Sequence, residues 1–131
     1  MAPTCLAIIL CECVVEDIRT RNKCILNTFN NITSKIFPLT IARLTVFATL
    51  TSGRGIMPMK VTLLKDGAES PMLDLKGELN FGNPLNVVDM IMDMRNIVFP
   101  SAGWYSVQVH CGGGISERRL SVMQTDAPEK D

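Results

Sequence analysis

Apolar and polar residues alternate in short segments along most of the chain. In residues 39–50, LTIARLTVFATL, every second residue from Ala42 to Leu50 is apolar, while the residues between them are arginine, threonine and one phenylalanine, Phe47. Successive side chains of a strand point to opposite faces, so this pattern predicts a strand with one buried face. Residues 52–55, SGRG, are typical of a glycine turn, and residues 56–67 predict the returning strand of a hairpin.

The other segments have the same character. Residues 73–79 alternate leucine with charged residues, and residues 23–32 predict a single strand. Residues 85–94, LNVVDMIMDM, are ambiguous because methionine favours helices, but the period-2 pattern and the β character of their neighbours favour a strand. About eight short strands with little helix predict an all-β fold, a two-layer antiparallel β-sandwich of immunoglobulin-like type.

The amino-terminal residues 4–15, TCLAIILCECVV, are apolar in both alternating sets. This predicts a strand that is covered on both faces or paired at an interface. No basic residue precedes Leu6, no small-residue cleavage pattern follows, and Glu12 interrupts the run short of the roughly 20 apolar residues of a membrane span. Five cysteines without regular spacing are typical of reduced thiols. We therefore expect a cytoplasmic protein.

Length and charge narrow the possibilities further. The chain has 131 residues, 47% of them hydrophobic, which is enough for the core of one domain. We expect a single β-sandwich domain over residues 1–123 and a polar, disordered tail over residues 124–131. The 13 basic and 13 acidic residues balance, so no global field attracts nucleic acid or an anionic membrane. Balanced charge also leaves little repulsion between copies.

The segment FPSAGWY, residues 99–105, predicts a turn that leads into a strand. Phe99 and Pro100 open the turn, and Gly103 supplies backbone freedom. A tyrosine directly after such a turn is typical of the tyrosine corner of immunoglobulin-like sandwiches. We expect Tyr105 to face the core and its hydroxyl to bond to the backbone of residues 99–102.

The order of these features resembles a family of small, uncharacterised bacterial β-sandwich proteins, classified only as a domain of unknown function. Its members open with an apolar strand and a polar turn, here LCECVVEDIRTRN, followed by a strand and hairpin, here IARLTVFATL and MKVTLLKDG. They close with Phe-Pro-x-x-Gly-x-Tyr and Arg-x-Leu-x-Val strands, here FPSAGWY and RRLSV. The resemblance covers residues 5–123 and implies a fold, without an activity or catalytic residues.

Nucleophilic and metal chemistry find little support in the sequence. His110 is the only histidine and shares a strand face with Ser106, but no carboxylate is evident that would orient the imidazole. Cys11 and Cys13 share a strand face, with Cys111 elsewhere in the chain, yet there is no Cys-x-x-Cys pair and no second histidine. We expect no catalytic residue, no metal and no cofactor.

Three further motifs are better explained by their positions in strands and turns than by a catalytic or binding role. Asp89 and Asp93 lie about 13 Å apart in a strand, beyond the roughly 5 to 9.5 Å that separates glycosidase carboxylates. The glycines at 112–114 precede a strand rather than the helix that a phosphate loop requires. Arg118 and Arg119 are too few to form a nucleic-acid platform.

Trp104 marks the predicted interface. It neighbours Tyr105 on a strand, so it stands on the polar face with Gln108 and His110 when Tyr105 faces the core. Tryptophan is enriched at interface hot spots, although a local loop or the tail is an alternative cover for the ring. We expect a homodimer with Trp104, Gln108 and His110, or with the strand at residues 5–15, in its interface.

The sequence thus favours a non-enzymatic protein-interaction or assembly module that binds itself or another protein through an exposed sheet face or edge. The alternative is a small-ligand-binding β-sandwich that uses loops at one end.

Overall fold

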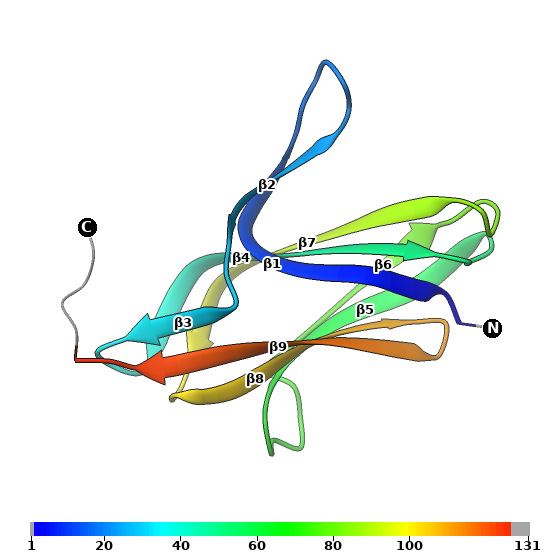
Figure 1. Ribbon diagram of the computed structural model, residues 1–131. Coiled ribbons are helices and arrows are strands. Elements are labelled where there is room, and N and C mark those ends of the chain that lie inside the picture. The colour runs from blue at the N-terminus through cyan, green and yellow to red at the C-terminus, as the bar shows by residue number, and fades with distance from the viewer. Residues whose placement is uncertain (1, 127–131) are drawn as a thin grey trace.

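The computed structural model describes residues 2–126, and this part of the chain contains nine strands, joined by turns and loops, and no helix. The strands form two packed sheets, as Figure 1 shows, with the orders β2-β1-β4-β7 and β3-β9-β8-β5-β6. The predicted all-β, two-layer sandwich is therefore confirmed. The strands are β1 (Thr4–Glu16), β2 (Lys23–Thr28), β3 (Asn31–Ser34), β4 (Leu39–Thr51), β5 (Ile56–Lys65), β6 (Leu73–Asn80), β7 (Val87–Phe99), β8 (Gly103–Cys111) and β9 (Gly114–Gln124).

Residues 23–32, predicted as one strand, form two strands in different sheets. β2 pairs with β1, whereas β3 pairs with β9. Asn27 has a φ of 55°, a left-handed conformation that asparagine tolerates better than most residues, and the chain then crosses between the sheets. The β3–β9 ladder is parallel and the remaining ladders are antiparallel. The alternation alone did not reveal this break.

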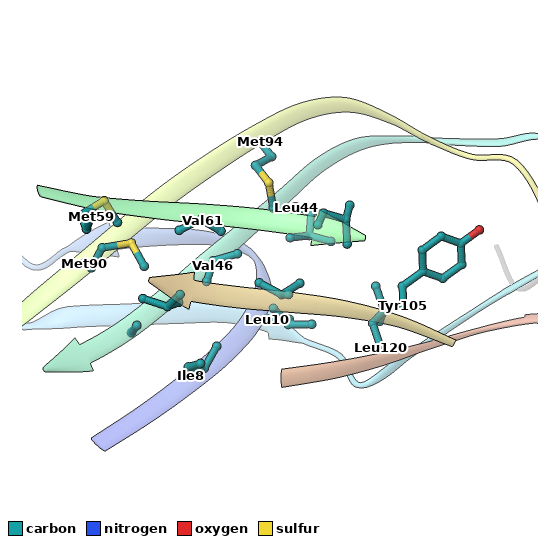
Figure 2. Packing of buried hydrophobic residues seen from close by; sticks show 14 of the residues in the cluster. Ile8, Leu10, Leu44, Val46, Met59, Val61, Met90, Met94, Tyr105 and Leu120 are labelled. Atoms are coloured by element: carbon teal, nitrogen blue, oxygen red, sulfur yellow. The ribbon is translucent and has the colours of Figure 1, made fainter. Parts of the chain in front are cut away.

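One hydrophobic core lies between the sheets, and Figure 2 shows part of it. Every second residue of β4 from Leu44 to Leu50 is buried, as the alternation predicts. Ala42, predicted on the same face, is exposed because the β4–β7 ladder is interrupted opposite it, at Asn96, where φ is 53°. β5, β8 and β9 supply the opposite wall of the core with Val61, Val107, Leu120 and their neighbours.

Within the ambiguous segment at residues 85–94, residues 87–94 belong to strand β7, as the period-2 pattern predicts, and residues 85 and 86 precede the strand. Met90 and Met94 are buried at 3% and 2% exposure, while Asp89 and Asp93 lie on the exposed face of β7. Flexible methionine side chains fill gaps between packed sheets well, so their presence does not require a helix.

The turn before β8 is fixed by the tyrosine that follows it. Tyr105 is fully buried, and its hydroxyl donates a hydrogen bond to the carbonyl of Ser101 at 2.6 Å, inside the segment where the sequence placed the partner. Its ring meets that of Phe99 edge-on, with centroids 4.9 Å apart. Gly103 has a φ of 144°, which few side chains allow, and Pro100 is exposed on the turn.

The carboxyl end of the described chain is tied to β3. Gln124 is the last residue of β9, and the amide of Thr125 donates to the carbonyl of Ser34 at 3.0 Å. The predicted tail at residues 124–131 therefore begins with residues that hold a strand position or a backbone hydrogen bond. Its last part, residues 127–131, lies outside the described residues.

Candidate functional site

The outer face of β8 carries the predicted interface residues, but they do not form one continuous exposed patch. Trp104 is 52% exposed, whereas Gln108 and His110 are half-buried. Ser106 stands between them and is only 3% exposed. The sequence predicted the face of each side chain correctly, yet it did not show that neighbouring strands bury the middle of the row.

An arginine partly covers the tryptophan. The guanidinium carbon of Arg119, on β9, lies 5.1 Å from the ring centroid of Trp104. A carboxylate holds this arginine in place, because Arg119 forms an ion pair with Asp66. Cation–π contact of this kind stabilises an exposed ring by about 0.5 to 1 kcal/mol. The cover on one side of the ring thus comes from the neighbouring strand β9, and not from a loop or the tail, the two alternatives that the sequence suggested.

His110 and Ser106 do not form a nucleophile–base pair. The Nε2 atom of His110 lies 3.3 Å from the Oγ1 atom of Thr62, its hydrogen-bonding neighbour on β5. Ser106 Oγ is buried without a hydrogen-bond partner among the described residues. Burial lowers the pKa of His110, and the ammonium of Lys60 lowers it further, while Asp74 acts in the opposite direction.

The cysteines lie in different environments. Cys11 and Cys111 are buried, Cys5 and Cys13 are half-buried, and Cys24 is exposed. The Cys11 thiol donates to the carbonyl of Thr45 at 3.6 Å, and burial raises the pKa of Cys11 and of Cys111. Within residues 2–126, no cluster of three histidine, cysteine or acidic side chains has the geometry of a metal site.

Asp93 has a structural role on the outer face of the four-stranded sheet. It pairs with Arg43 and Arg95, with N–O distances of 3.0 Å to each, and it accepts a hydrogen bond from Thr45. The hydrogen bond from Arg43 lowers the pKa of Asp93. Asp89 lies on the same exposed face of β7 but takes no part in the Asp93 contacts.

The distal part of the β1–β2 hairpin, residues 12–28, projects away from the sandwich (Figure 1). In β1, side chains are buried only between Ile8 and Cys11, and beyond Cys11 they are half-buried or exposed. Asn27 Nδ2 donates to Glu12 Oε2 at 3.0 Å where the β1–β2 ladder is interrupted. The predicted cover on both faces of the first strand therefore applies only to its middle.

The register between β1 and β2 shows which side chains share each face of the hairpin. Cys13 pairs with Leu26, and Val15 pairs with Cys24. Directly paired residues share a face, so these four side chains form an apolar surface that we call the hairpin face. Val15 is 45% exposed and Leu26 is 43% exposed. No second sheet lies against this surface in Figure 1.

A pocket of about 380 Å³ lies on the five-stranded sheet, over strands β5, β6 and β8. Its lining includes Pro58, Lys60, Lys76 and His110, together with the turn at Gly112–Gly113. Sequence reasoning missed the two lysines, which stand 16 positions apart on separate strands. Only the strand register brings them together, and alternation does not specify register.

The comparisons identify a family without an assigned function. Residues 6–122 match the family of unknown function DUF6941, and the chain belongs to this family. This span is nearly the one over which the sequence features resemble a domain of unknown function. No curated protein matches the chain. Within the described residues, none of the secondary structure is a helix of the length and hydrophobicity that a membrane crossing needs.

Proposed function

We propose that this protein is a non-enzymatic assembly module whose hairpin face binds a second copy of the chain. The observation that supports this most strongly is the exposure of Val15 and Leu26 on a hairpin that projects from the sandwich. A two-stranded hairpin is marginally stable in water on its own. Cover over its apolar face would stabilise it.

A second copy suits the hairpin face for two reasons. The chain carries no formal net charge, so two copies approach without strong repulsion. The turn beside the face carries both signs of charge, with ion pairs between Arg19 and Asp17 and between Arg21 and Glu16. A two-fold axis brings a surface against itself, and a rim with both signs of charge can pair across that axis.

The second candidate surface is the outer face of β8, with Trp104, Gln108 and His110. It is less suited to a strong interface because Arg119 already contacts the Trp104 ring and Ser106 lies buried in the middle of the row. The two surfaces lie on different sheets, so substitutions can separate them.

Light scattering coupled to size exclusion tests the proposal. At micromolar concentration we expect wild type to elute as a dimer, and the double variant Val15→Ser, Leu26→Ser to elute as a monomer with unchanged circular dichroism. Trp104→Ser is the matched control and should remain dimeric. A monomeric wild type would contradict self-association. A dimer that Trp104→Ser dissociates, and the hairpin variant does not, would assign the interface to β8.

We also propose the finer structural and cellular assignments. The bond from Tyr105 to Ser101 and the Phe99 contact support an immunoglobulin-like sandwich with a tyrosine corner. Five free cysteines support a reducing compartment such as the cytoplasm. The proposed assembly role requires no cofactor and involves neither nucleic acid nor membrane.

A further inference from the structure

Three basic side chains stand in one row across neighbouring strands of the five-stranded sheet. Lys76 of β6 lies directly opposite Lys60 of β5, and Lys60 lies directly opposite His110 of β8. Directly opposed residues share a face, with Cβ atoms about 4.5 to 5.5 Å apart. Like charges in this position destabilise a sheet, so the Lys60–Lys76 pair is unfavourable unless an anion accompanies it.

No salt bridge within residues 2–126 neutralises the two lysines of this row, Lys60 and Lys76. The acidic residues of the same face are Asp74, opposite Thr62, and Glu78, opposite Pro58, and they flank the row without forming a salt bridge to it. The lowered pKa of His110 agrees with a site where burial and the charge of Lys60 disfavour a further cation.

The pocket at this row has the properties of a small-ligand site. Its volume of about 380 Å³ lies at the lower end of the range for ligand pockets. Most of the pocket lining is apolar. Pro58 and the Gly112–Gly113 turn both contribute to this lining. A ligand that fits this lining has an apolar body and one anionic group for the lysines.

We propose that the pocket over β5, β6 and β8 binds a small monocarboxylate with an apolar chain or ring, held by Lys60 and Lys76. The carboxylate lies between the two ammonium groups, and the apolar part packs on Pro58 and the lysine stems. His110 lies at the β8 end of the row, with its imidazole near the bound anion. This site is independent of the hairpin face and does not require the protein to form dimers.

Titration with hexanoate, followed by amide nitrogen–proton NMR at neutral pH and low salt, tests the proposal. We expect saturable shifts centred on Gly77, Gly112 and Gly113. Lys60→Met and Lys76→Met keep the apolar stem but remove the charge, and each should weaken hexanoate binding about fivefold. Added salt should weaken binding in wild type.

Matched controls test separately whether the anionic group and the apolar body of the ligand contribute to binding. Lys35→Met removes an exposed lysine that follows β3, at the far end of the sheet, and should leave the affinity unchanged. Hexanol, which lacks the charge, and inorganic phosphate, which lacks the apolar body, should each bind more weakly than hexanoate. Shifts that never saturate, lysine variants that bind hexanoate as tightly as wild type, or equal binding of phosphate and hexanoate would overturn the proposal.

Discussion

The β8–β9 hairpin and the distal part of the β1–β2 hairpin both carry apolar side chains, yet they differ in how these are covered. The β8–β9 hairpin contributes to the core, whereas β1 contributes only through its proximal part, with Ile8 and Leu10. In β8, Tyr105 and Val107 are fully buried, because the four-stranded sheet lies across from them. In the distal β1–β2 hairpin, Val15 and Leu26 remain nearly half exposed, because no opposing sheet reaches that far. Strand alternation therefore shows that a face needs cover, and the fold decides whether the same chain provides it.

The comparison also separates two roles for apolar surface. Apolar side chains in β8 stabilise the fold of one chain, whereas those of the hairpin face add little until something binds over them. Substitutions in the two hairpins should therefore affect different measurements.

The largest expected effect is on Tyr105. Tyr105→Ala empties core volume beside Phe99 and should lower the free energy of unfolding by about 3 to 5 kcal/mol. Tyr105→Phe should lower it by about 1 kcal/mol, through the lost hydrogen bond to Ser101. Val15→Ala, measured on monomeric protein, should change it by less than about 1 kcal/mol. Urea melts in which Tyr105→Ala and Val15→Ala cost the same would show that the hairpin is as tightly packed as the core.

Thiol reactivity compares the two regions without a core substitution. Cys24 in the hairpin is exposed, whereas Cys111 in β8 is buried and has a raised pKa. Because the thiolate is the reactive form and a buried thiol reacts only after opening, we expect Cys24 to react with an aromatic disulfide reagent at least about 100-fold faster than Cys111 when the protein is dilute enough to be monomeric.

Cys24→Ser is the control for the thiol experiment and should remove the fast phase. Raising the protein concentration should slow the reaction of Cys24 if the hairpin face is covered by a second copy. Equal rates for all five thiols would contradict the difference between the two hairpins.

Local periodicity predicted most of the fold correctly. The faces of β5, β6 and β8, and of β4 from Leu44 to Leu50, follow from alternation alone, and so does the strand that contains Met90. Two features did not follow, namely the division of residues 23–32 into two strands and the parallel pairing of β3 with β9. The chain leaves β2 shortly after the left-handed residue Asn27, and a single asparagine does not by itself reveal a left-handed conformation or a break.

The surfaces were harder to predict than the core. The sequence placed Trp104 on the outer face, but the cover by Arg119 depends on the pairing of β8 with β9. The Lys60–Lys76 pair depends in the same way on the pairing of β5 with β6. A shift of two residues in either ladder preserves every buried face and changes every cross-strand neighbour, so alternation cannot distinguish between such registers.

The smallest expected effect is a pH dependence at His110. Its folded-state pKa is below the ordinary value of 6.5, first because of burial and then because of Lys60 opposite it, with Asp74 opposing the shift. The unfolded chain therefore binds the proton more readily. The stability from the neutral imidazole is fully present above about pH 6.5 and is lost as pH falls through the folded-state pKa. Asp93, whose pKa is lowered, contributes in the same direction only at much lower pH.

Urea melts between about pH 7.5 and about pH 5.5, in buffers without carboxylate or phosphate, test this dependence. The free energy of unfolding of wild type should decline as pH falls, and His110→Gln should remove the decline. An anion bound at Lys60 and Lys76 favours the charged imidazole, so hexanoate should reduce the decline. A decline of equal size in wild type and His110→Gln would assign it to other groups.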